Sequence, residues 1–435
     1  MKKIFFSILS LVFLVAGAQE NVLPAPEQSQ PIAVTGATVH VGNGQVINNA
    51  TVVMTQGKIT AIGSDVVIPA NAQRIDARGK HVYPGLILAS SNLGLVEIGN
   101  IRASNDVREL GEMNPNVRSI VAYNTDSKII NTLRSNGVLL ANIVPEGNLL
   151  SGSSSVVQLD AWNWEDAAYK TDQGIVFTMP SFLPRSRFFP SGTASAGPPR
   201  DPVKEALEKV EEVKTFFREA KAYQSIQTQE ATNLKFESVK GLFNKSMKLY
   251  VRANTVKQML VALDFVKEFG FDMVIIGGSD SWQIADLLKQ NNVSVILNKT
   301  HNLPTLADDD VDQPYKTPAL LQKAGVNFVI NDDDEQTRGR NLMFNAGTAV
   351  TYGLTKEQAL QSITLNAAKV LGIDKQTGSI EVGKDANIII SEGDILDMRT
   401  NLVTHAFIQG RNINLDDKQK QLNERFLKKY GLKEF

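Results

Sequence analysis

Two patterns of apolar and polar positions divide the chain. Residues 32–68 form short β-like runs separated by Gly-Asn-Gly, Asn-Asn and Gln-Gly turn signals, which predicts a small antiparallel sheet. The same style returns near the other end, in 378–382, 386–390 and 404–408. A β-rich start and a β-rich end around a different middle predict one composite β domain, built from residues 32–82 and 378–411.

The middle of the chain, residues 83–377, alternates short apolar runs with amphipathic stretches. The runs are rich in β-branched residues, as buried parallel strands are, and occur at 137–144, 271–277, 292–298 and 326–331. The stretches have apolar residues at helical spacing and include 201–223, 255–269 and 281–291. This alternation predicts a parallel α/β fold, either a barrel or a doubly wound sheet, and the pattern alone does not choose between them.

The first residues are typical of an export signal. Lys2 and Lys3 precede an apolar run over 4–15, and Ala16-Gly17-Ala18 has the small-x-small form of a cleavage site. We therefore expect a signal peptide over 1–18, a Pro-rich linker over 19–31, and a periplasmic or secreted protein. Residues 412–435 are expected to form a helical tail.

Composition excludes several kinds of partner and chemistry. The chain has 435 residues, 45 Lys and Arg against 46 Asp and Glu, no Cys and four His. A charge this balanced gives no electrostatic reason to expect nucleic acid, or a membrane after signal cleavage. Disulfides, thiolate catalysis and Cys-based metal sites are excluded, and any metal centre would have few candidate ligands.

Two terminal motifs carry a resemblance to a known family. The stretch GKHVYPGLILASSNLG (79–94) and the later stretch TLNAAK (364–369), followed by GSIEVGKDAN (378–387), resemble amidohydrolases of the metal-dependent, imidazolonepropionase-like and dihydroorotase-related kind. The resemblance covers nearly all of the chain after the signal. It implies a distorted (β/α)8 TIM-like barrel with a composite β-sandwich domain, and so selects the barrel over the doubly wound sheet.

The same resemblance marks positions where the family carries metal ligands. These enzymes have Asp-x-His-x-His after the first barrel strand, and here Ser90 and Asn92 stand at the two His positions. Arg252 and Gly277 stand where two later strands carry His. The acid at the end of the last strand is retained, with Asp333 as the matching residue.

These substitutions predict a degenerate metal site. A neutral hydroxyl or amide is a weak zinc ligand, glycine offers no ligand, and Arg252 cannot lose its proton to become one. We therefore expect no cofactor, although the family would use zinc. Without a metal, the pKa of bound water is not lowered from about 15.7 toward about 7, so the usual hydroxide nucleophile is absent. We expect the Arg252 guanidinium to lie in the vacated site, against Asp333 or Asp332.

Two functions follow from this interpretation. The first is a non-catalytic subunit that binds a small-molecule or peptide-like ligand, and that pairs with an active amidohydrolase relative or with a second copy of the chain. The alternative is a working hydrolase of cyclic amide or peptide-like C–N bonds, with Asp333 as base, His301 as a second catalytic candidate and a weak or substituted metal site. His301 follows a predicted strand, whereas His40, His81 and His405 lie in or next to the β domain and are interpreted as structural.

Overall fold

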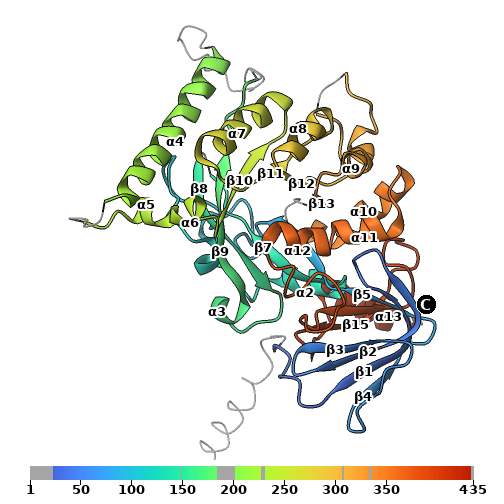
Figure 1. Ribbon diagram of the computed structural model, residues 1–435. Helices are drawn as coiled ribbons and strands as arrows, with labels where there is room; N and C mark the ends of the chain where they lie inside the picture. Colours follow the sequence, from blue (N-terminus) through green and yellow to red (C-terminus); the bar gives the residue numbers. More distant parts are fainter. Residues whose placement is uncertain are drawn as a thin grey trace, which may run out of the picture.

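The computed structural model divides into two sheets, each with its own core (Figure 1). It describes residues 23–147, 149–183, 201–226, 231–305, 308–332 and 336–432. The predicted signal peptide lies outside these ranges. Within them, no helix combines the length and apolar character that crossing a membrane requires.

The first sheet combines both ends of the described chain. Its strand order is β16-β15-β14-β5-β1-β2-β3, with β4 paired to β1. The N-terminal strands are β1 (Ile32–His40), β2 (Val46–Thr55), β3 (Lys58–Gly63), β4 (Gln73–Asp76) and β5 (His81–Pro84). The C-terminal strands are β14 (Ile388–Ser391), β15 (Val403–Ile408) and β16 (Arg411–Asn412). Antiparallel pairing of β5 with β14, which sets Val82 opposite Ile390, joins the two groups.

The second sheet is a nearly closed eight-stranded barrel, as expected from the resemblance. Its strands are β6 (Leu86–Ser91), β7 (Val138–Ile143), β8 (Leu150–Gln158), β9 (Ala168–Thr178), β10 (Lys248–Ala253), β11 (Met273–Gly277), β12 (Ser294–Leu297) and β13 (Phe328–Ile330). Neighbouring strands are parallel except at β8, which runs antiparallel to both β7 and β9. The TIM-like barrel is therefore confirmed, with one strand reversed.

Helices cover the outside of the barrel (Figure 1). The helices of the described residues are α2 (Lys128–Ser135), α3 (Trp164–Ala167), α4 (Pro202–Gln224), α5 (Leu234–Ser238), α6 (Lys240–Phe243), α7 (Val256–Phe269), α8 (Ala285–Gln290), α9 (Gln313–Ala324), α10 (Leu342–Thr351), α11 (Lys356–Ser362), α12 (Leu365–Leu371) and the outlying α13 (Lys418–Tyr430). Short 3-10 turns are η1 (Arg102–Ser104), η2 (Ser119–Ala122), η3 (Ser281–Ile284) and η4 (Gln336–Asn341). The stretch predicted as one helix over 281–291 is thus split between η3 and α8.

Local chemistry explains where the best-predicted helices begin and end. The side chain of Asp201 accepts a hydrogen bond from the Val203 N–H, and Pro202 opens α4. Thr255 and Gln258 form a reciprocal capping box at the start of α7, which ends at Gly270 with φ +72°.

One end of the barrel is closed by α12. Apolar side chains of α12, including Val370 and Leu371, pack in the same buried cluster as Tyr250 and the other inward-facing strand residues. Lys248, the first residue of β10, donates to the Val370 carbonyl at 2.6 Å, and Asn366 of α12 donates to the carbonyl of Phe328, the first residue of β13, at 3.0 Å. Because both contacts are made at strand starts, α12 lies across the N-terminal end of the barrel. The opposite end is the mouth.

A side chain closes the seam between β13 and β6. Asn331, directly after β13, accepts hydrogen bonds from the N–H groups of Ala89 and Ser90 at 3.0 and 3.2 Å. Its Nδ2 donates to the Ser90 carbonyl at 2.8 Å. The amide thereby supplies the donor and the acceptor that a neighbouring strand would otherwise supply.

Candidate functional site at the barrel mouth

The end of β6 places Ser90 and Asn92 at the mouth. Ser90 is buried, and its backbone is held by Asn331 as described above. Asn92 is half-buried and donates to Glu146 Oε1 at 3.3 Å. The β6–β7 register shifts between Leu88 and Ser91, so the strand is irregular next to the two positions where the resemblance predicts imidazoles.

Gly277 ends β11 in a backbone conformation that disfavours any side chain. Its φ is +104°, in the region that L residues rarely adopt. A Cβ built on it would lie 2.3 Å from Asn254 Oδ1 and 3.2 Å from the Ala253 carbonyl oxygen. The space next to the glycine is therefore taken by the end of β10.

Arg252 and Asp332 lie at the ends of β10 and β13. Arg252 is half-buried and stands opposite Ile276 of β11 in the parallel register. Asp332 is buried, and its Oδ2 accepts a hydrogen bond from Asn345 Nδ2 at 3.0 Å. Asp333 lies outside the described residues. The expected contact of Arg252 with Asp333 or Asp332 therefore stays a prediction.

His301 lies on the loop after β12 and faces α10. Its Nε2 is 2.6 Å from Thr348 Oγ1, and its backbone N–H donates to Asn345 Oδ1 at 3.1 Å. Partial burial lowers the pKa of His301 below its usual 6.5, so the ring is neutral at pH 7. The other three histidines lie in the composite sheet: His40 on β1, His81 on β5 and His405 on β15.

Three mouth residues were not found by sequence reasoning. Asn331 and Asn345 are buried amides that tie mouth loops together, and no motif marks a single amide. Asp280, after the Gly277-Gly278 turn, is a buried carboxyl that accepts from the Val256 N–H at 3.3 Å. Burial raises the pKa of Asp280, and the nearby Asp309 adds to the rise. The signal that could have found it is an acid three residues after a predicted strand.

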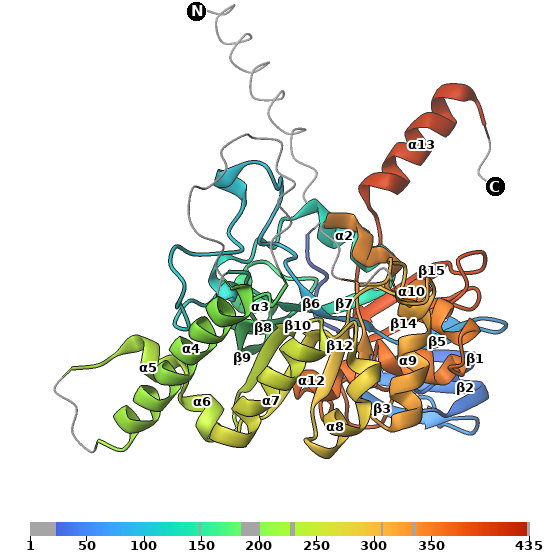
Figure 2. The same ribbon diagram turned by 90° about the horizontal axis from the view of Figure 1, so that it is seen from above.

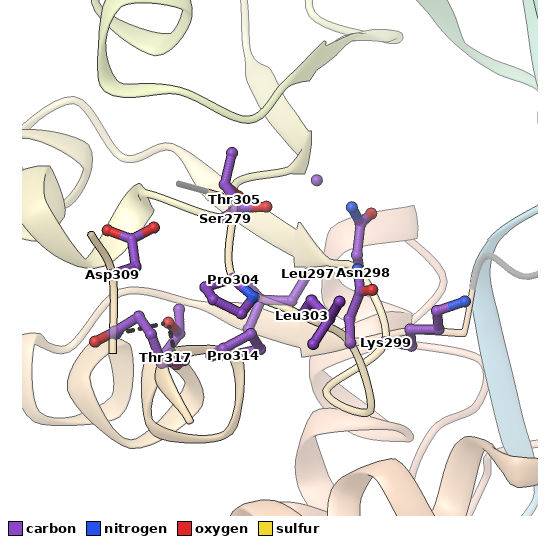
Figure 3. A pocket seen from close by; sticks show the side chains of 13 residues that line it. Ser279, Leu297, Asn298, Lys299, Leu303, Pro304, Thr305, Asp309, Pro314 and Thr317 are labelled. Carbon is purple, nitrogen blue, oxygen red and sulfur yellow. Dashed lines mark hydrogen bonds between the residues drawn. The ribbon is translucent and has the colours of Figure 1, made fainter. Parts of the chain in front are cut away.

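A small pocket opens at the ends of β11 and β12 (Figure 3). Its volume is about 40 Å³, and a water needs roughly 10–15 Å³ of such space, so only a small group fits. The lining combines apolar, amide, hydroxyl and charged groups, among them Leu303, Pro304, Asn298, Ser279, Lys299 and Asp309. A small polar fragment is the kind of group this pocket can hold.

The described residues contain no group of three or more His, Asp or Glu side chains placed to hold a metal ion. The mouth therefore offers hydrogen-bonding amides and hydroxyls, a buried carboxyl at Asp280 and a fixed cation at Arg252.

Comparison with known proteins places this architecture in one family. The amidohydrolase family profile matches residues 194–416, more than half of the chain. The imidazolonepropionase of Thermoplasma volcanium is 25% identical over 382 residues, which cover 82% of this chain and 89% of that protein. The imidazolonepropionase of Picrophilus torridus is 36% identical over 177 residues, which cover 38% of this chain and 42% of that protein.

A solved structure agrees. The amidohydrolase from Thermotoga maritima superposes with a TM-score of 0.75 at 24% identity, covering 88% of this chain and 99% of that one. With a nearly closed barrel and a sheet built from both ends, the molecule has the architecture of that class. The chain belongs to the amidohydrolase family.

Proposed function

We propose that this chain is an exported amidohydrolase-family protein that binds a small polar ligand at the barrel mouth and does not use the family's metal site. The comparisons support hydrolysis of carbon–nitrogen bonds as the chemistry of the relatives. The ligand proposed for this chain is correspondingly a small amide or peptide-like molecule. A periplasmic or secreted location rests on residues 1–18 alone.

The backbone at the end of β11 carries this proposal. At Gly277, a positive φ and an Asn254 oxygen 2.3 Å from the Cβ position oppose any ligating side chain. The other three positions do not fit zinc either, because Ser90 and Asn92 are weak neutral donors and Arg252 is a permanent cation. A catalytic zinc site needs about three protein ligands and an open position, and this donor set does not supply them.

Metal content and turnover of the same preparation test the proposal. We expect protein purified from zinc-supplemented cells to hold far less than one zinc per chain, and to leave cyclic amides and dipeptides intact. About one tightly held zinc per chain, with hydrolysis that a chelator abolishes, would contradict the proposal. A double variant, His40→Ala with His81→Ala, is the control, since these adjacent rings in the composite sheet, with nitrogens 3.0 Å apart, could bind stray metal away from the mouth.

A working hydrolase is the second candidate, and Asp280 is the observation that favours it. A buried carboxyl of raised pKa at a barrel mouth is a common property of catalytic acids and bases. In that case Asp333 would act as base, with His301 as a second group. Hydrolysis without added metal that is lost in both Asp333→Asn and His301→Ala would support this candidate, whereas binding without turnover in the wild type would exclude it.

A further inference from the structure

Helix α13 presents an apolar stripe that the rest of the described chain does not cover. Leu422, Phe426 and Tyr430 are spaced four residues apart and so lie on one face of the helix. They are 36, 47 and 63% exposed, and none of the thirteen residues of α13 is buried. The rings of Phe426 and Tyr430 stack at 6.3 Å, which makes the stripe a continuous surface.

The first turn of α13 is nevertheless firmly anchored. Asp417 is buried, caps the helix by accepting from the Lys420 N–H at 2.9 Å, and also accepts a hydrogen bond from Ser135 of α2. Thr132 of α2 donates to Gln419 at 3.0 Å. The rest of the helix extends away from the body (Figure 2). A helix fixed at its base and exposed along its length is suited to contact another molecule.

Charge restricts what can cover the stripe. The helix carries five basic residues, Lys418, Lys420, Arg425, Lys428 and Lys429, and one acid, Glu424. Two such helices placed side by side would repel each other, so the stripe requires a surface that is apolar and not basic.

Residues 95–126, between β6 and α2, offer such a surface. Ile98, Leu110 and Val121 are 54, 85 and 55% exposed. The segment has five acidic and three basic residues, and one of the basic ones, Arg118, is paired with Asp172 at 2.7 Å. Bridges from Met113 and Arg118 to β8 hold the segment on the barrel. The segment is therefore held on the barrel, carries exposed apolar side chains and is mildly acidic.

Both elements extend toward the same side of the molecule (Figure 2), where the 95–126 segment is drawn in blue to cyan and α13 in red. When the donating and the accepting surface share one side, a two-fold axis on that side lets each copy cover the other, and the assembly closes as a dimer. We propose that α13 of one chain packs on residues 95–126 of a second copy, and reciprocally. This inference does not depend on the ligand or chemistry of the barrel mouth.

Sedimentation velocity of the purified protein over a range of micromolar concentrations tests the proposal. We expect a dimer for the wild type, and a monomer for Phe426→Glu and for Leu110→Glu, each with a dimer Kd raised about 100-fold or more, since each change affects both contacts. The circular dichroism spectrum should be unchanged because neither side chain is buried in one chain, whereas the melting temperature should fall to that of the monomer. Lys420→Gln, on the helix but off the stripe, should leave the dimer intact.

Mixing the two monomeric variants gives the sharpest result. A Phe426→Glu chain paired with a Leu110→Glu chain retains one unaltered contact, so the mixture should recover part of the dimer that neither variant forms alone. A monomeric wild type, including one that instead sediments with anionic phospholipid vesicles, would overturn the proposal. A dimer lost in Phe426→Glu but unaffected by Leu110→Glu would also overturn it.

Discussion

The two ends of the barrel are held together differently. The closed end is packed by α12 against Tyr250 and the other inward-facing residues, with Lys248 bonding to a helix carbonyl. The mouth is held by single amide side chains, Asn331 and Asn345. Ser90, Asn92, Arg252 and Gly277, the positions where the resemblance predicts metal ligands, lie at the mouth. Side chains at the mouth can therefore change while the packing that stabilises the fold is kept.

Tyr250→Ala should have the largest effect on stability. The side chain is fully buried inside the barrel and donates to Gln173 Oε1 at 2.7 Å. Its removal leaves a cavity at the closed end, so we expect the free energy of unfolding to fall by about 3–5 kcal/mol in urea titrations. Tyr250→Phe keeps the volume and should cost about 1–3 kcal/mol. Equal costs for the two variants would contradict the packing argument.

Asn331→Ala should cause the second-largest loss of stability. It removes the three hydrogen bonds that join β13 to β6 and leaves buried backbone groups of Ala89 and Ser90 without those partners. We expect a loss of about 3 kcal/mol in the free energy of unfolding. The matched control is Asn366→Ala at the closed end, which removes one such bond. If both variants cost the same, Asn331 does not close the seam.

Gly277→Ala should lower the free energy of unfolding by about 2 kcal/mol, because it adds backbone strain and a clash with Asn254. Gly270→Ala is the control, because its φ of +72° also disfavours a side chain but nothing lies within 4 Å of the added Cβ. We expect Gly270→Ala to lower the free energy of unfolding by about 1 kcal/mol. Combining Gly277→Ala with Asn254→Ala should recover the difference. A neutral Gly277→Ala would remove the main support for the proposed loss of the metal site.

Lowering the pH should have the smallest effect, and it acts in part through His81 of the composite sheet. Burial and the adjacent His40 lower the pKa of His81 below its usual 6.5. The unfolded chain then binds more protons below about pH 6.5, so the free energy of unfolding should fall as pH drops toward the lowered pKa. Urea midpoints at pH 8 and pH 5.5 measure this. His81→Gln should reduce the pH dependence, and an unchanged slope would be the contrary result.

The features predicted correctly from the sequence are those that depend on repeated patterns along the chain. Turn signals and apolar runs indicated both sheets, and the two terminal motifs selected the barrel. The reversed strand β8 was missed because a buried strand has the same composition in either direction. Asn331 and Asn345 were missed because their importance comes from neighbours that are distant in sequence. The positive φ of Gly277 could not be predicted either, because glycine adopts positive and negative φ with similar ease.

The reversal of β8 also changes how the mouth can evolve. In a fully parallel barrel, every strand delivers its carboxyl end, and hence one variable loop, to the functional face. Here β7 and β8 share a single connection at the mouth, and the link from β8 to β9 passes at the closed end. The barrel thus has one fewer loop at which new side chains can be recruited than it has strands. New functional side chains at the mouth must therefore arise in the remaining loops, one of which is the long segment over 95–126.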